Sequence, residues 1–345
     1  MAKYLFPFLT AFLLTVLLMF VFMPLAKLIG WKERKSARHI HKKDIYRIGG
    51  VAMILVFNLV ILLNKDLVLT PELWGMMVGT IVLMVVGVRD DIKEIYWKIQ
   101  FFFQVVVSVL VFVLGVRIYY VTNPLSGGVI NMEYGIGVLF SAALVVVWIV
   151  TVINATNWLD GIDGLSSGIA VITAITIAVL SLRKEVSQPA VAIIAAIFSG
   201  TVLGFLVFNF NPARAMAGTS GAMFLGFAIA VLAVFSGTKI ATAILVMAIP
   251  IIDFFWVIGQ RIRSGQPIFR PDRNHLHYRL LELGWPQKKI ALVYYLITSA
   301  IAVIALNTRV IGKSLTLAIA FLVMFVASWA INKRISTIRI NENNS

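Results

Sequence analysis

Carboxylate and amide side chains are concentrated in two short segments of the chain. Asp90 and Asp91 are adjacent, and segment 154–165 holds two Asn and two Asp punctuated by glycines. Adjacent carboxylates resist joint ionisation unless a cation or proton compensates them, so the pair indicates either metal binding with a general base or a solvated helix end. Asp160 and Asp163 are three residues apart and would share one face of a helical turn. Their segment favours ligand binding over simple helix capping.

Cations and imidazoles occupy two other segments. Segment 270–279 contains His275 and His277 with several Arg, and segment 38–50 has a similar mixture. Such groups suit a diphosphate or sugar hydroxyls, and a His-x-His pair can also bind a metal. The alternative is a basic loop beside anionic lipid. A fifth segment, 208–221, offers backbone N–H groups that suit an anion ahead of a helix, or forms an ordinary loop and N-cap.

The elements that must position these segments are apolar. The chain has 345 residues, of which 60% are hydrophobic and 13% charged, and its mean hydropathy is +0.95. A soluble domain has about 45–50% apolar and about 25% charged residues, so we expect an all-α, polytopic membrane protein. The net charge is +15, and the basic residues that produce it lie between apolar runs. It therefore favours membrane orientation, and we expect no nucleic-acid partner. The absence of Cys excludes disulfides, a thiolate nucleophile and Cys-ligated metal.

A membrane crossing needs about 20 apolar residues, and the hydropathy pattern predicts about eleven transmembrane helices. Their expected ranges are 4–29, 48–64, 73–88, 99–118, 137–153, 165–182, 190–208, 222–236, 238–258, 289–306 and 315–332. With the N-terminus outside and the C-terminus inside, 20 of the 30 Lys and Arg residues lie in inner segments, in agreement with the positive-inside rule. All five polar segments then face the cytoplasm.

No internal repeat or linker divides the chain. We expect one integral membrane domain over residues 1–345 with a short polar tail at 333–345. An outer segment, 119–136, has Asn-Pro and Gly-Gly between β-prone stretches and predicts a small hairpin. Carboxylates, amides, cations and imidazoles that converge on one membrane face suit phosphoryl transfer, which needs charge neutralisation and positioning more than covalent work by the protein.

At these residues the sequence resembles the polyprenyl-phosphate N-acetylhexosamine-1-phosphate transferases, membrane enzymes that start bacterial cell-wall and surface-glycan assembly. The family pattern Asn-x-x-Asn-x-x-Asp-Gly-x-Asp-Gly-Leu is matched in full from Asn154 to Leu165, which is the most specific signal. Further matches are Asp90, Asp91, Lys98, Gln104, Arg38, His41, Arg47, Gly49, Gly50, Arg273, His275 and His277. The Pro-Asp-Arg-x-His-x-His form is similar to the branch that uses UDP-N-acetylglucosamine for teichoic-acid, lipopolysaccharide O-antigen or common-antigen synthesis.

The resemblance implies a metal-dependent enzyme of the bacterial cytoplasmic membrane. It would transfer N-acetylglucosamine 1-phosphate, or a related sugar 1-phosphate, from a UDP-N-acetylhexosamine to undecaprenyl phosphate and release UMP. The implied cofactor is Mg²⁺ or Mn²⁺, held by Asp91 with Asp163 as the second candidate. The implied catalytic residues are Asp90, Asp91, His275 and His277. The implied nucleotide-sugar ligands are Lys43, Asn154, Asn157, Asp160, Asn209 and Arg273. A homodimer is compatible with the sequence.

One loop departs from the family pattern, and three other functions remain open. Thr219 stands where the family usually has an Asp implicated in metal binding, and Met216 replaces an aromatic residue that can stack on uracil. A catalytically weakened relative would follow from Thr219. A lipid transporter would more often place ionisable residues at the bilayer midplane. A phospho-muramoyl-pentapeptide transferase of peptidoglycan synthesis usually has three consecutive His, a run that Tyr278 interrupts here.

Overall fold

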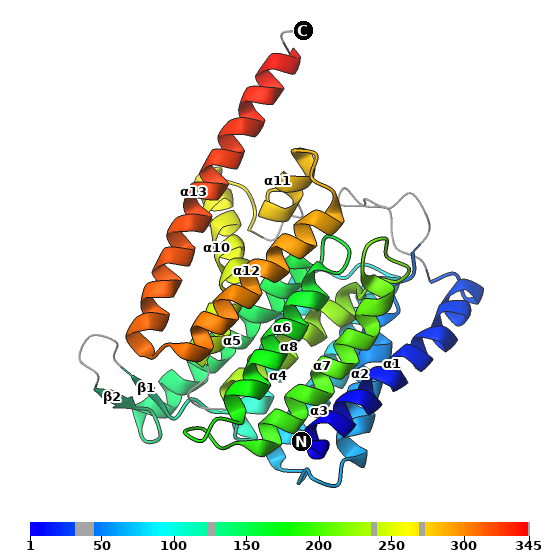
Figure 1. The fold of residues 1–345 in the computed structure, drawn as a ribbon, viewed down its shortest axis with the longest axis vertical. Helices are drawn as coiled ribbons and strands as arrows, with labels where there is room; N and C mark the ends of the chain where they lie inside the picture. The colour runs from blue at the N-terminus through cyan, green and yellow to red at the C-terminus, as the bar shows by residue number, and fades with distance from the viewer. Residues whose placement is uncertain (32–44, 123–127, 236–239, 269–272, 344–345) are drawn as a thin grey trace.

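The computed structural model describes residues 1–31, 45–122, 128–235, 240–268 and 273–343, and it shows a bundle of helices with one small hairpin (Figure 1). The predicted all-α class is confirmed. The helices are α1 (Ala2–Leu28), α2 (Gly49–Leu63), α3 (Pro71–Ile92), α4 (Trp97–Val113), α5 (Ile136–Leu159), α6 (Leu165–Ser181), α7 (Pro189–Asn209), α8 (Gly218–Phe235), α9 (Ile240–Val246), α10 (Ala248–Arg263), α11 (Leu276–Glu282), α12 (Gln287–Asn307) and α13 (Val310–Asn343). The strands are β1 (Tyr120–Thr122) and β2 (Val129–Asn131).

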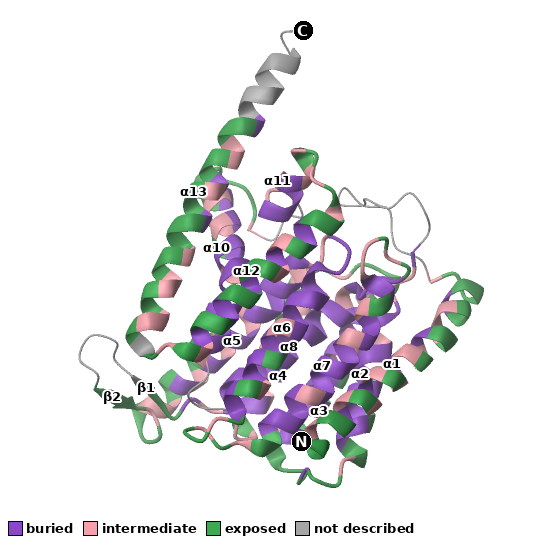
Figure 2. Cartoon of the chain, in the orientation of Figure 1, coloured by how far each residue is buried: buried purple, intermediate pink, exposed green. Residues whose placement is uncertain are grey.

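Helix α8 lies at the centre of the bundle. All of its residues except Thr219 and Phe235 are buried, and it packs against α2, α3, α5 and α6. A helix that is apolar on every face is expected in an interior. Figure 2 shows the contrast with α1 and α13, which lie at the periphery and expose most of their apolar side chains.

Glycines allow neighbouring helices to approach closely. Gly200 and Gly204 lie four residues apart on α7, and a Cβ on each would come 2.1 and 2.7 Å from the carbonyl oxygens of Phe8 and Phe12 on α1. Gly226 of α8 lies in the same way against the backbone of α5. Small residues spaced by four are typical of tightly packed membrane helices.

The segment predicted as one span at 238–258 is a bent pair of helices. Helices α9 and α10 meet at an angle of 73°. Pro250, in the first turn of α10, has no N–H to donate to the carbonyl of Val246, so a continuous helix is interrupted there. Helix α10 then leads to α11, which carries His277.

The described residues contain seven helices long and apolar enough to cross a membrane, or eight if the bent pair is one span. This supports a multi-pass membrane protein. Each predicted span overlaps a helix or the bent pair, but α2, α4 and α6 have only 15, 17 and 17 residues. A perpendicular crossing needs about 20. The number of eleven spans and their orientation stay predictions.

The hairpin predicted at 119–136 is present. Its two strands are antiparallel, with Tyr120 opposite Asn131. The hairpin precedes α5 and lies at the opposite end of the bundle from α11 (Figure 1). Because α5 runs the length of the bundle between them, the Asn- and Asp-rich segment at its C-terminal end lies on the side of α11.

Candidate active site

The first polar segment is joined to the loop that precedes α8. Tyr46 forms a parallel bridge with Ala215, and the N–H of Gly50 donates to the carbonyl of Ala217 at 2.9 Å. A Cβ on Gly50 would lie only 2.2 Å from the backbone nitrogen of Gly221. Only glycine therefore fits here, which gives a physical reason for the glycine pair at the start of α2.

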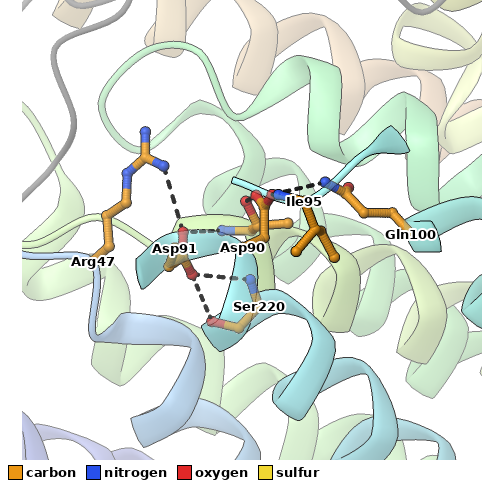
Figure 3. A network of polar contacts seen from close by, with 7 residues as sticks. Arg47, Asp90, Asp91, Ile95, Gln100 and Ser220 are labelled. Atoms are coloured by element: carbon orange, nitrogen blue, oxygen red, sulfur yellow. Dashed lines mark hydrogen bonds and ion pairs between the residues drawn. The ribbon is translucent and has the colours of Figure 1, made fainter. Parts of the chain in front are cut away.

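Asp91 ends α3 with its carboxylate against the first turn of α8. Its Oδ1 accepts the N–H of Thr219 at 2.9 Å, and its Oδ2 accepts from the N–H and hydroxyl of Ser220 at 3.4 and 3.3 Å. Arg47 adds an ion pair at 3.4 Å, as Figure 3 shows. The residue is only 2% exposed. A carboxylate in this place satisfies N–H groups at a helix start and complements the helix dipole, so Asp91 caps α8 from a different helix.

Asp90 is directed elsewhere and is partly exposed (Figure 3). Its Oδ1 accepts the N–H of Ile95 and the side-chain amide of Gln100, both at 3.0 Å. Its Oδ2 accepts the hydroxyl of Thr219 at 2.7 Å. These donors fix the carboxylate while part of the side chain stays open. Of the adjacent pair, Asp90 is the residue that a ligand can reach.

The contact between α3 and α8 depends on two glycines. A Cβ on Gly87 would lie 2.2 Å from the Cα of Ser220, and a Cβ on Gly218 would lie 2.5 Å from Oδ2 of Asp91. Gly218 also has a φ of 71°, which favours glycine. The glycine three residues before Asp90 therefore lets α3 approach closely enough for Asp91 to reach the start of α8.

Asp163 is buried and joins the loop between α5 and α6 to the loop after α7. Its Oδ2 accepts the side-chain amide of Asn211 at 2.8 Å and the N–H of Ala213 at 3.0 Å. Its own N–H donates to the side chain of Gln287 on α12 at 3.0 Å. Asp163 is 1% exposed, and its hydrogen bonds join the loop before α6, the loop after α7 and the start of α12.

Asp160 and Asn157 are the partly exposed members of the same motif. Asp160 follows the last residue of α5 and accepts the hydroxyl of Ser166 at 2.5 Å. The predicted helical face shared with Asp163 does not form, because residues 160–164 are turns between α5 and α6. Gly164, with a φ of 75°, is in a left-handed conformation that interrupts the helix.

The amides of Asn154 and Asn209 connect elements. Asn154 donates to the side-chain oxygen of Gln104 on α4 at 2.6 Å. Asn209 is fully buried, accepts the N–H of Gly164 at 3.2 Å and donates to the carbonyl of Ala215 at 3.0 Å. Asn154 therefore joins α5 to α4, and Asn209 joins the loop before α6 to the loop before α8.

The last polar segment meets the loop between α5 and α6 at Gly161. A Cβ there would lie 2.3 Å from the hydroxyl of Tyr278 and 2.7 Å from Nε2 of His277. The ring of His275 stacks on that of His277, with centroids 5.7 Å apart and an interplanar angle of 13°. Contacts thus run from the first polar segment through α8 and the Asp-rich loop to the imidazoles, and the described parts of all five segments form one site.

One buried carboxylate outside the predicted set belongs to this site. Asp253 of α10 accepts from Nδ1 of His275 at 2.8 Å and from the N–H of Leu276 at 2.9 Å. An Asp at mid-helix in a bilayer costs roughly 2.5–3.5 kcal/mol. The single acidic residue in the apolar run 238–258 was therefore a signal of function, but no motif linked it to His275.

Two further predicted ligands are Lys43 and Arg273. Lys43 lies outside the described residues, as do Arg38 and His41. Arg273 is described and exposed. The predicted role of Lys43 therefore stays a prediction. Arg273 is accessible near the start of the last polar segment.

Comparison with known proteins decides the family. Residues 73–237 match the family model described as Glycosyl transferase family 4. A decaprenyl-phosphate N-acetylglucosaminephosphotransferase of Mycobacterium leprae is 31% identical over 302 residues, which cover 79% of this chain and 75% of that protein. The chain belongs to the polyprenyl-phosphate hexosamine-1-phosphate transferase family. The predicted resemblance is confirmed, and the chain is a sugar-phosphate transferase.

Two further relatives show where this transferase lies within the family. A probable undecaprenyl-phosphate N-acetylglucosaminyl 1-phosphate transferase of Bacillus subtilis is 29% identical over 326 residues, 92% of this chain and 88% of that protein. A phospho-N-acetylmuramoyl-pentapeptide-transferase of Bacillus pumilus is 28% identical over 323 residues, 89% and 98% of the two chains. The second match is weaker, in agreement with the interrupted run of His.

The transferase's described residues fit a divalent cation only in part. They contain no cluster of three or more His, Asp or Glu that could hold a metal. Asp91 and Asp163 are buried and accept hydrogen bonds from protein donors, whereas Asp90 is accessible. Mg²⁺ often uses one or two carboxylates with substrate phosphates and water. The geometry therefore favours Asp90 over Asp91 and Asp163, and it suits a cation that binds together with a diphosphate.

Proposed function

We propose that the protein transfers N-acetylglucosamine 1-phosphate from UDP-N-acetylglucosamine to undecaprenyl phosphate and releases UMP. The observation that carries this proposal is the convergence of carboxylate, amide and imidazole groups from five separate segments at one end of the bundle. The names of the relatives in Bacillus subtilis and Mycobacterium leprae specify N-acetylglucosamine and a polyprenyl phosphate, which supports the donor and the acceptor.

The reaction is a displacement at phosphorus. An oxygen of the lipid phosphate attacks the phosphorus that carries the sugar, and the bond from that phosphorus to the bridging oxygen of UMP breaks. A phosphate monoester has a second pKa of about 6, so the nucleophile is largely a dianion at neutral pH and needs orientation more than deprotonation. Catalysis of this kind rests on positioning and on charge neutralisation.

The chain's residues divide into those that face the substrates and those that support them. Asp90, fixed by Gln100, Ile95 and Thr219, would orient the lipid phosphate through a bound cation, since a carboxylate and a phosphate dianion repel each other. Mg²⁺ or Mn²⁺ would neutralise the diphosphate and would be held by Asp90. The residues proposed to contact the nucleotide sugar are Lys43, Asn157, Asp160, Arg273, His275 and His277. Asn154, Asn209, Asp91 and Asp163 hold the loops that carry them.

We also propose a topology with eleven crossings, the N-terminus outside, the C-terminus inside, and the site at the cytoplasmic face of the bacterial cytoplasmic membrane. The distribution of Lys and Arg supports this orientation. The short helices α2, α4 and α6 can complete their crossings with the loop residues that flank them, since a bilayer thins around a short hydrophobic segment.

Purified protein tests the proposal directly. The enzyme is incubated with undecaprenyl phosphate and Mg²⁺, and with UDP-N-acetylglucosamine, UDP-N-acetylgalactosamine or UDP-N-acetylmuramoyl-pentapeptide in separate reactions. We expect UMP and a diphosphate-linked lipid sugar with UDP-N-acetylglucosamine, and loss of turnover in excess EDTA. Product from the pentapeptide donor alone would assign the chain to the peptidoglycan branch. No UMP from any donor would refute the proposed activity.

A further inference from the structure

Asp253 and His275 form a buried pair between α10 and the last polar segment. The carboxylate accepts from Nδ1 of His275 at 2.8 Å with one oxygen and from the N–H of Leu276 at 2.9 Å with the other. Asp253 is 5% exposed and His275 is 1% exposed. Two directed bonds from one carboxylate fix both the ring and the backbone of the imidazole segment where α11 begins.

The other ring nitrogen of His275 lacks a partner. Among the described residues, Nε2 of His275 is buried and makes no hydrogen bond. A buried polar atom without a hydrogen-bond partner lowers the stability of the fold by about 1–3 kcal/mol. Such an atom in a native structure calls for an explanation, and a functional role is one of them. The ring therefore has one nitrogen bonded to protein and one whose hydrogen-bonding capacity is unused among the described residues.

Aromatic side chains hold the ring in place. Trp158, from the Asn- and Asp-rich motif, packs edge-on against His275 with centroids 5.2 Å apart. Phe254 contacts Trp158 at 4.6 Å, and the guanidinium of Arg261 lies over the Trp158 ring at 4.7 Å. These contacts connect α5 and α10 to the imidazole, so its orientation is set by the same motif that forms the Asp-rich loop.

A carboxylate on one ring nitrogen decides what the other can do. With Nδ1–H donated to Asp253, the ring is fixed in one tautomer, and the negative charge compensates an imidazolium. In that charged form Nε2–H is a hydrogen-bond donor suited to a phosphate oxygen. The chemistry of the unpartnered nitrogen therefore matches a diphosphate.

We propose that Asp253 is a positioning residue of the transferase, which holds His275 so that Nε2 binds the diphosphate of the nucleotide sugar. This inference rests on the proposed function, because it takes the diphosphate of a UDP-sugar as the ligand. Asp253 itself does not touch the substrate and acts through His275.

The first test compares two ligands that differ only in the diphosphate. Asp253→Asn keeps the shape of the side chain but removes the negative charge that compensates an imidazolium, so the ring would meet the diphosphate as a neutral group with a weaker hydrogen bond. Loss of the partner that orients a metal-ligating His typically costs about 10–100-fold, and we use the lower end of that range for His275. We expect Asp253→Asn to weaken UDP binding, measured by calorimetry on the full chain, by about 10-fold or more and to leave uridine binding unchanged. Equal losses for UDP and uridine would overturn the proposal, because they would indicate general distortion.

The second test is a double-mutant cycle on turnover. If Asp253 acts through His275, the variant with both Asp253→Asn and His275→Ala is no slower than His275→Ala alone, since residues that act as a unit are not additive. Multiplied losses would overturn the proposal. Asp253→Glu keeps the charge and should recover part of the turnover. If Asp253→Asn does not fold, UDP binding is measured in Asp253→Glu and His275→Ala instead. Wild-type UDP affinity in both folded variants would also refute the proposal.

Ser328 provides the matched control. It belongs to α13, a helix that does not carry His275, and it lines a small polar hollow together with Asp253. Ser328→Ala removes a polar group beside Asp253 without changing the bond to the imidazole, so UDP binding should stay at the wild-type value. Failure of the proposed function is distinguishable from failure of this inference. In the first case the wild type releases no UMP, while the UDP and uridine affinities of wild type and Asp253→Asn can still be compared.

Discussion

At the scale of single residues, Asp90 and Asp91 are neighbours with different tasks. Successive residues at a helix end point about 100° apart, since a turn holds 3.6 residues. Helix α3 therefore directs Asp91 inward to the start of α8, where it is 2% exposed, and leaves Asp90 accessible. Asp91 therefore stabilises the start of α8, while Asp90 is the member of the pair that a ligand can reach.

This difference predicts distinct phenotypes for two isosteric substitutions. Asp90→Asn should lower kcat at least about 10²-fold, the range for loss of one group that stabilises transition-state charge, with a smaller fall in unfolding temperature than Asp91→Asn, because Asp90 is partly exposed. Asp91→Asn should lower stability as well as activity, because each hydrogen bond to a charged group contributes about 1.5–3 kcal/mol. UMP release and thermal unfolding in detergent separate the two. Near-normal turnover in folded Asp90→Asn would make that residue a solvated helix end.

Thr219 supplies a hydroxyl where the family usually has a carboxylate. Its Oγ1 donates to Oδ2 of Asp90 at 2.7 Å, so a carboxylate at position 219 would lie beside that of Asp90. Two such groups repel unless a cation lies between them. We expect Thr219→Asp to reach half-maximal activity at a lower Mg²⁺ concentration than the wild type, in a titration under saturating UDP-sugar.

Thr219→Asn is the control for this prediction, because Asn is close in size to Asp and adds no charge. The Asn variant should not shift the Mg²⁺ midpoint downward. If the curve of Thr219→Asp coincides with that of the wild type, or needs more metal, then position 219 does not face a cation in this protein.

The sequence located the segments that the structure brings together, whereas the hydrogen-bond partners of their residues could not be predicted. The full motif from Asn154 to Leu165 located the Asp-rich loop. Asn154 donates to Gln104, and Asn209 joins Gly164 to Ala215. Such pairings depend on how helices pack, which periodicity does not report. Hence two residues predicted as ligands prove to connect elements, while their roles toward nucleotide stay a prediction.

At the scale of elements, close packing of α3 on α8 places the cap formed by Asp91. A Cβ on Gly87 would meet backbone atoms of Ser220, at 2.2 Å from Cα and 2.4 Å from N. Backbone cannot move aside as a side-chain end can. Gly87→Ala should therefore separate the two helices, at a cost typical of overpacking of about 1–3 kcal/mol. A lower unfolding temperature and a loss of UMP release are the expected results.

Gly259→Ala is the matched control for the packing prediction. Gly259 lies within α10, and a Cβ there would meet no atom within 4 Å. Ala is favoured over Gly in a helix by roughly 1 kcal/mol, so this variant should be as stable as the wild type or more stable. Equal behaviour of the Gly87 and Gly259 variants would contradict a packing role for Gly87.

Helix positions could be predicted because each apolar run is long, but helix shape could not. The run 238–258 satisfied the hydropathy criterion although α9 and α10 meet at 73°. Pro250 was visible in the sequence, yet a proline in a membrane helix can be accommodated by neighbouring groups without a large bend. Pro250 removes one helical hydrogen bond, but hydropathy does not report how far the helix bends there.

At the scale of the whole molecule, the two ends of the bundle differ in chemistry. One end carries the carboxylates, amides and imidazoles of the site, and the other carries the β-hairpin (Figure 1). Basic residues follow the same division along the sequence, with 20 of 30 in the segments predicted to lie inside. If the positive-inside rule holds, the end with the site faces the cytoplasm and the hairpin faces outward.

Cysteine labelling tests this orientation without background, because the chain contains no Cys. Ile130 in the hairpin and Glu94 after α3 are both exposed and lie at opposite ends. We expect a membrane-impermeant maleimide to label Ile130→Cys in intact spheroplasts and to label Glu94→Cys only after the membrane is permeabilised. Both variants should keep UMP release, which verifies the fold in which each is labelled. Labelling of Glu94→Cys from outside, with Ile130→Cys protected, would invert the topology and place the site away from the cytoplasm.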